Sequence, residues 1–72
     1  MAARRIAMVM AEHGLNLRLG PDRDCPRVGV LPAGTQVTAL VVPPALRRSG
    51  WTAVSAGDVA GWVMTEHLAF GG

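Results

Sequence analysis

Apolar and polar residues alternate along several short stretches of the chain. The clearest case is residues 15–19, where three leucines alternate with Asn16 and Arg18. A period of two is typical of a strand with one buried face, and turn residues follow such stretches at intervals of about eight to twelve residues. No segment shows the spacing of an amphipathic helix. The pattern therefore predicts an all-β fold.

Glycine and proline set the limits of the predicted strands. Gly20-Pro21 and Pro43-Pro44 each end a strand, because proline has no N–H to donate to a sheet. Residues 69–70 suit a last short strand. The other predicted strands cover residues 6–11, 15–19, 27–31, 35–42, 51–57 and 59–64.

Three local features are predicted within this frame. Gly57-Asp58 is expected to form a hairpin turn between two strands. Gly29 lies inside a strand, where glycine marks a bulge or the close approach of two backbones. Residues 65–68 suit one turn of 3₁₀ helix with Thr65 as its cap.

The predicted architecture is a small SH3-like barrel of five to six short antiparallel strands with one 3₁₀ turn near residues 65–68. A chain of 72 residues has a thin core, and closing the sheet hides strand edges that a small open sheet would leave exposed. We expect one domain over residues 6–70, with flexible ends at 1–5 and 71–72.

The net charge is +2, and all seven basic residues are arginine. Acidic residues stand among them, as Asp22 and Asp24 do on either side of Arg23. Because no uninterrupted basic stripe is present, nucleic acid is not the expected partner. The single cysteine, Cys25, excludes an intramolecular disulfide and a cysteine-based zinc site.

The N-terminal apolar stretch is too short for a signal peptide or a membrane span. It covers residues 6–11 and is interrupted by Glu12, whereas a signal core needs about 7–15 apolar residues and a membrane span about 18. We therefore interpret it as a strand and expect a cytoplasmic protein with no membrane partner. A virion component would reach a cell wall without a signal of its own.

The order and spacing of these signals resemble the bacterial SH3-like (SH3b) domain family over roughly residues 6–70. The matching residues are Leu15, Asn16, Leu17, Arg18, Gly20, Pro21, Gly29, Leu31, Gly34, Val37, Gly50, Trp51, Val54, Gly61, Trp62, Val63 and Leu68. The resemblance implies an SH3-like barrel and a binding module.

Three residues depart from the family pattern. Leu19 stands where the family has a small polar residue, and Thr52 and His67 stand where it often has aromatic residues. Because the family's ligand surfaces commonly use such aromatics, the binding face is expected to be poor in them. An aromatic-lined groove for proline-rich peptides is not expected.

Asn16 and Arg18 have two interpretations. They either face a ligand on the rim of the barrel, or they hold the following turn. In the second, which we favour, the Asn16 amide bonds to the turn backbone and Arg18 pairs with Asp22 or Asp24. A partner at the neighbouring Leu19 would be met by packing rather than by hydrogen bonds.

The two tryptophans are expected to differ in exposure. Trp62 lies within a strand that closes the barrel, so it is predicted to be core or part-core, since tryptophan supplies much apolar area. Trp51 opens its strand beside a polar loop, so it is the better candidate for an exposed ring that contacts a partner.

The candidate chemistry is sparse. Glu12-His13 and Glu66-His67 carry zinc-ligand types, but adjacent residues on a strand point to opposite faces, so no metal site is expected. Ser49 and Ser55 have no activating context, and no phosphate-binding glycine loop is present. Neither catalysis nor a cofactor is therefore predicted.

The main hypothesis is a non-enzymatic module that docks a protein or peptide through the loops around residues 20–27 and 43–51. Within it, the family suggests a cell-wall peptide or glycan, or a phage or prophage assembly. The candidate partner-binding residues are Trp51, Arg47, Arg48, Asn16, Arg18 and Leu19.

The alternative is a small β-barrel that binds nucleic acid, with arginines on phosphates and Trp51 stacked on a base. A third expectation is weak self-association, because the apolar residues exceed what one small barrel can hide. The residues that suggest it are Met8, Met10, Leu40, Val42 and Leu46.

Overall fold

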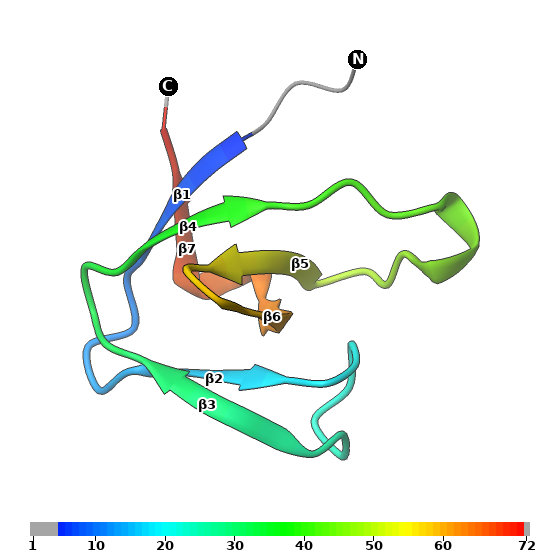
Figure 1. Ribbon diagram of the computed structural model, residues 1–72, viewed down its shortest axis with the longest axis horizontal. Helices are drawn as coiled ribbons and strands as arrows, with labels where there is room; N and C mark the ends of the chain where they lie inside the picture. The colour runs from blue at the N-terminus through cyan, green and yellow to red at the C-terminus, as the bar shows by residue number, and fades with distance from the viewer. Residues whose placement is uncertain (1–4, 72) are drawn as a thin grey trace.

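Seven strands and two short 3₁₀ turns make up the computed structural model, which describes residues 5–71 (Figure 1). The strands are β1 (Arg5–Val9), β2 (Leu15–Arg18), β3 (Arg27–Leu31), β4 (Gln36–Ala39), β5 (Trp51–Ala56), β6 (Val59–Met64) and β7 (Leu68–Phe70). The turns are η1 (Pro44–Leu46) and η2 (Thr65–His67). The predicted all-β class is confirmed, and the predicted turn near 65–68 is present as η2.

All the strands belong to one antiparallel sheet with the order β3-β2-β6-β5-β4-β1-β7. The first and last strands are neighbours, since Met8 of β1 stands opposite Ala69 of β7. The link between β2 and β6 is a single pair, Arg18 opposite Trp62. At this link the sheet turns, so that β2 and β3 lie below the other strands in Figure 1.

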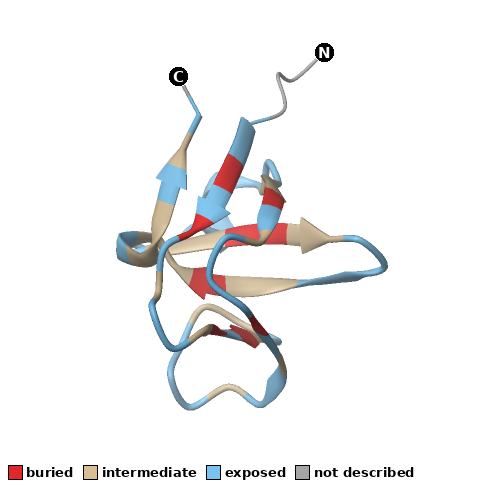
Figure 2. Cartoon of the chain, turned by 90° about the vertical axis from the view of Figure 1, so that its left-hand side faces the viewer, coloured by how far each residue is buried: buried red, intermediate tan, exposed pale blue. Residues whose placement is uncertain are grey.

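The core lies inside the curled sheet and is formed by alternate residues of six strands (Figure 2). In β2, Leu15 and Leu17 are buried while Asn16 between them is exposed, as the alternation predicts. No polar side chain is buried among residues 5–71. The core cluster consists of Ala7, Val9, Leu15, Leu17, Leu31, Val37, Val54 and Val63.

The strand predicted over residues 35–42 is too long, because β4 ends at Ala39. The amide of Leu40 makes a last bond, 2.8 Å, to the Ala53 carbonyl, and the chain then leaves the sheet. Two prolines follow at 43 and 44, where no N–H is available for a ladder. Residues 40–50 instead form a projecting segment, here called the arm, with η1 near its tip (Figure 1).

Thr65 is not the cap of the 3₁₀ turn. The cap position belongs to Met64, and no side chain there caps the turn by a hydrogen bond. The Thr65 amide instead donates to the Gly50 carbonyl, 2.8 Å away, which holds Thr65 in line with β6. Its hydroxyl therefore meets the hydroxyl of Thr52 on β5, at 2.7 Å.

Gly57 and Gly29 were each predicted to have a local structural role, the first in a turn and the second at a bulge or a close approach. Gly57 has a φ of 62° in the β5–β6 hairpin, as the turn prediction requires. The bulge lies beside Gly29, because Leu17 pairs with Gly29 and Arg18 with Arg27, which leaves one residue between them unpaired. A Cβ added at Gly29 would meet no atom within 4 Å, so of the two predicted alternatives the bulge is present and the close approach is not.

Two residues assigned above to the chain ends lie in the described part of the structure. Arg5, assigned above to a flexible end, begins β1. Gly71, also assigned to an end, donates its amide to the Ile6 carbonyl at 3.0 Å. The rest of both predicted ends, residues 1–4 and 72, lies outside the described residues. Within the described part, no helix has the length and apolar character needed to cross a membrane.

Candidate functional site

A groove of about 600 Å³ opens between the arm and the barrel. Its volume lies in the range of small-ligand and peptide-side-chain pockets. Both tryptophans and the single phenylalanine line it, and these are all the aromatic residues of the chain. The other lining residues are Arg5, Ala39, Leu40, Val41, Val42, Arg47, Thr52, Ala53 and Thr65.

The β5–β6 hairpin brings the two tryptophans together. Ala53 on β5 stands opposite Trp62 on β6, and Trp51 lies two residues before Ala53. Residues two apart on a strand share a face, so Trp51 and Trp62 are diagonal neighbours on the same face. Diagonal partners are about 7–8 Å apart at the backbone, which is within reach of aromatic side chains.

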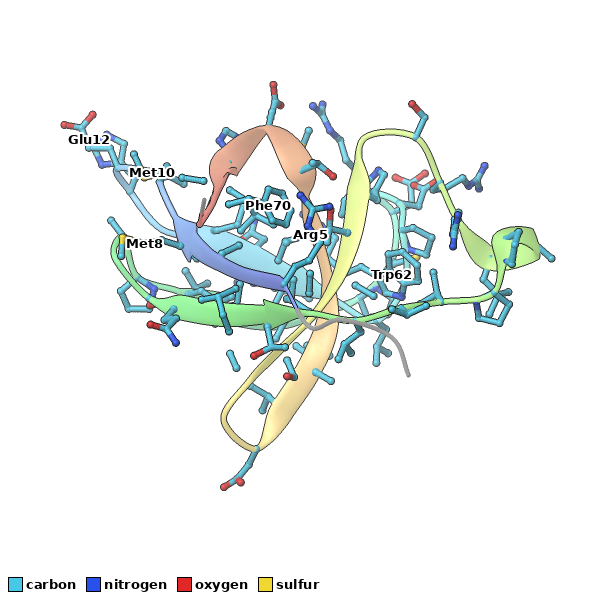
Figure 3. All side chains as sticks on the ribbon, turned by 90° about the horizontal axis from the view of Figure 1, so that it is seen from above. Arg5, Met8, Met10, Glu12, Trp62 and Phe70 are labelled. Atoms are coloured by element: carbon cyan, nitrogen blue, oxygen red, sulfur yellow. The ribbon has the colours of Figure 1, made fainter. Side chains whose placement is uncertain are left out.

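The pairing of the first and last strands builds the opposite end of the groove. Ala7 of β1 stands opposite Phe70 of β7, and Arg5 lies two residues before Ala7 on the same face. The guanidinium carbon of Arg5 lies 4.2 Å from the centre of the Phe70 ring. Figure 3 shows Arg5 against Phe70, with Trp62 on the side toward the arm.

The exposure of the aromatics suits contact with a partner. Trp51, Trp62 and Phe70 are all half-buried, so each keeps some surface open to a partner. Trp62 is half-buried and lines the groove, but it is not among the residues packed against the core cluster, so its predicted core or part-core position is wrong. The sequence analysis left it out of the site because a strand that closes the barrel was expected to hold this ring in the core or partly in it.

Arg47 and Trp51 are the two predicted site residues that the structure brings together. Arg47 lies on the arm, where its Nε donates to the Val42 carbonyl at 3.3 Å. Arg48 is exposed but does not line the groove. Leu19 is 63% exposed and belongs to the β2–β3 connection, which contributes nothing to the groove lining.

Arg18 holds the loop after β2, but not in the predicted way. Its Nη1 donates to the Cys25 carbonyl at 3.0 Å. Neither Asp22 nor Asp24 pairs with it, and the Asp22 carboxylate accepts the Asp24 amide at 2.8 Å. Since Glu66–His67 is the one ion pair found within residues 5–71, the predicted Arg18 ion pair is wrong.

Asn16 does not make the predicted bond to the turn. Its side chain is exposed opposite Val30 and forms no hydrogen bond with the described residues. Backbone bonds fix the loop instead: the Leu19 amide donates to the Pro26 carbonyl at 3.0 Å, and the Cys25 amide to the Asp22 carbonyl at 3.1 Å. Together with Arg18, these bonds make the Asn16 amide unnecessary for the turn.

A second, shallower hollow of about 390 Å³ lies beside the turn between β1 and β2. Asn16, His13 and His67 line it, together with Glu12. Glu66 and His67 approach each other at 3.7 Å, contrary to the expected divergence, because both lie on η2 rather than on a strand. Across residues 5–71, no three His, Cys, Asp or Glu side chains gather closely enough to hold a metal ion.

Arg5 and Phe70 are the groove residues that sequence reasoning missed. The available signal was the expected pairing of the first and last strands of such a barrel. An arginine near the start and the only phenylalanine near the end of the chain are brought together by that pairing. Assigning Arg5 to a flexible end concealed the contact.

Comparison with known proteins adds a family to this geometry. A family model described as a bacterial SH3 domain matches residues 13–69. No curated protein and no solved structure matches the chain. The matched range includes Arg47, Trp51 and Trp62, whereas Arg5 and Phe70 fall outside it.

Proposed function

Because the chain belongs to the bacterial SH3 domain family, a family of small binding modules, we propose that it is a non-enzymatic module that docks a protein or peptide partner in the groove. The observation that carries the proposal is the gathering of all three aromatic side chains with Arg5 and Arg47 in one groove. Tryptophan and arginine are enriched among the residues that dominate binding energy in protein interfaces.

The lining of the groove supports binding rather than catalysis. It contains no His, Cys, Asp or Glu side chain, which are the usual acids, bases and nucleophiles. Its two hydroxyls, on Thr52 and Thr65, bond to each other. The arm adds an apolar wall through Leu40 and Val41, which are 42% and 67% exposed.

The class of partner is tested by offering three probes to the immobilised chain. These are a random 12-residue peptide display library, purified peptidoglycan and a single-stranded oligothymidine. We propose a peptide segment of a protein as the partner, including a component of a phage assembly or a cell-wall peptide. Retention of oligothymidine that strengthens at low salt, with no peptide enriched, would instead support nucleic-acid binding, because phosphate contacts strengthen as salt falls.

Trp51→Ala is expected to weaken binding of the enriched peptides by about thirtyfold or more, because truncating a central aromatic typically costs about 2 kcal/mol or more. The measurement is titration of the purified variants with one synthetic enriched peptide. Leu19→Ala is the matched control, since Leu19 is 63% exposed and outside the groove, and its affinity should equal that of the wild type. Equal affinities for all three proteins would contradict the assignment of the groove.

We also propose weak self-association through the outward face of β1. Ile6, Met8 and Met10 are 44%, 46% and 59% exposed and alternate with the buried Ala7 and Val9. The other predicted residues, Leu40, Val42 and Leu46, lie on the arm, where Leu40 and Val42 line the groove.

Met8→Glu places a charge in the middle of the β1 face and is expected to reduce self-association in sedimentation equilibrium at high concentration. Leu46→Glu, on the exposed arm, is the matched control and should leave this association unchanged. A wild-type protein that stays strictly monomeric would show that this face does not associate.

A further inference from the structure

The groove has an uneven charge. Two arginines line it, and no acidic residue of the chain does. The acids are placed on the β1–β2 turn, in the loop after β2, at the tip of the β5–β6 hairpin and on η2. They are Glu12, Asp22, Asp24, Asp58 and Glu66.

Arg5 is held in place while its hydrogen-bond donors stay available. Its guanidinium lies 4.2 Å from the centre of the Phe70 ring. The Glu66–His67 contact is the one ion pair within residues 5–71, so no carboxylate there neutralises Arg5. The ring attracts the positive charge of the guanidinium and does not occupy its N–H groups. These N–H groups form a planar fork that matches the geometry of a carboxylate.

Arg47 is placed in a similar way at the arm. The bond from its Nε to the Val42 carbonyl, 3.3 Å, directs the side chain along the groove wall. The terminal N–H groups make no hydrogen bond or ion pair with residues 5–71. Each guanidinium is therefore positioned by one contact and keeps free donors for an anion.

We propose that the groove binds an acidic peptide segment, with carboxylates at Arg5 and Arg47 and an apolar side chain packed against Trp51 and Trp62. The inference rests on the proposed function and adds the chemistry of its ligand. An apolar wall and two separate cations suit a peptide in which carboxylates flank an apolar residue. A nucleic acid is less well matched, because its affinity grows with the number of phosphates neutralised and only two arginines line this groove.

The test uses the peptides enriched from the random library. We expect Asp or Glu on one or both sides of an apolar residue. A synthetic enriched peptide is then compared with its Asn/Gln counterpart, and both are titrated against wild type, Arg5→Gln, Arg47→Gln and the control Arg23→Gln. Arg23 is exposed in the loop after β2 and lies outside the groove.

Arg5→Gln and Arg47→Gln are each expected to bind the acidic peptide about threefold to tenfold more weakly than the wild type does. The wild type is expected to bind the neutral peptide more weakly than the acidic one by a similar factor. This is the loss expected for one exposed, charge-assisted carboxylate contact. Arg23→Gln, which removes the same charge elsewhere, should bind as the wild type does. Added salt should lower the affinity for the acidic peptide more than the affinity for the neutral one, because salt screens exposed charges.

The outcomes separate this inference from the function on which it rests. Enriched peptides without an acid preference, or equal losses in Arg5→Gln, Arg47→Gln and Arg23→Gln, would overturn the acidic ligand and leave peptide docking standing. If the wild type enriches no peptide relative to the Trp51→Ala protein, both the acidic ligand and peptide docking in the groove would be overturned. Arg47→Gln keeps the test valid even where Arg5→Gln lowers the melting temperature through lost contact with Phe70.

Discussion

Leu17→Ala is expected to lower the free energy of unfolding by about 2–5 kcal/mol, because truncating a buried leucine loses apolar burial and leaves a cavity. Leu17 is 1% exposed and is among the largest fully buried side chains. A domain of this length has a total stability on the order of 5 kcal/mol. Much of the variant is therefore expected to be unfolded at room temperature, as measured by urea denaturation followed by tryptophan fluorescence.

Leu19→Ala is the matched control for Leu17. Leu19 is two residues later in the same alternating stretch but is 63% exposed, so its loss should change the unfolding free energy by less than about 0.5 kcal/mol. Similar destabilisation by both variants would contradict the core assignment. It would mean that β2 does not bury one face of the alternation.

Gly61→Ala is expected to lower the free energy of unfolding by about 1–3 kcal/mol, the usual cost of overpacking a well-packed site. A Cβ at Gly61 would lie 2.7 Å from the Arg18 carbonyl oxygen and 2.8 Å from Leu17 Cγ. Backbone cannot move aside as a flexible side chain can. Thermal unfolding monitored by circular dichroism measures the effect.

Gly29→Ala is the control for Gly61, with an expected effect of the opposite sign. No atom lies within 4 Å of a Cβ at Gly29, and its φ is not in the positive range. Because glycine in a strand is about 0.5–1 kcal/mol less favourable than alanine, this variant should be as stable as the wild type or slightly more stable. A loss of stability equal to that of Gly61→Ala would disprove the close approach at Gly61.

The Gly61 contact also matters for the groove. Gly61 precedes Trp62, and the β2–β6 link in the sheet is the single pair between Arg18 and Trp62. A shift of β6 away from β2 would therefore move the Trp62 ring relative to Trp51. We expect Gly61→Ala to weaken peptide binding as well as stability, whereas Gly29→Ala should change neither markedly.

Local sequence patterns predicted the parts of the fold that depend on neighbouring residues. The alternation in β2 correctly identified Leu15 and Leu17 as inward-facing, and Gly57-Asp58 correctly marked the β5–β6 turn. The predicted end of β4 was wrong, because the strand ends at Ala39 although apolar residues continue to Val42. A run of apolar residues favours a strand, but a strand also needs a partner for its backbone, and β5 provides none beyond the bond from the Leu40 amide to the Ala53 carbonyl.

The sequence predicted only some of the residues that line the candidate site. Arg47 and Trp51 lie four residues apart in the chain, and their position beside a loop suggested a binding role. Arg5 and Phe70 are almost the full length of the chain apart, and Trp62 was predicted to be core or part-core rather than part of the site. Asn16 and Arg18 were each predicted to bond to groups close to them in the sequence. In the structure Arg18 bonds to the Cys25 carbonyl instead, and Asn16 makes no side-chain hydrogen bond with the described residues.

The sequence by itself determined the all-β class, most strand positions, the alternating core residues and the family resemblance, because these depend on short-range periodicity and turn chemistry. Only the tertiary structure decided that one groove collects every aromatic residue with Arg5 and Arg47 and excludes every acid. The reason is that closure of the sheet, through the β1–β7 and β2–β6 pairings, sets which distant side chains share a face.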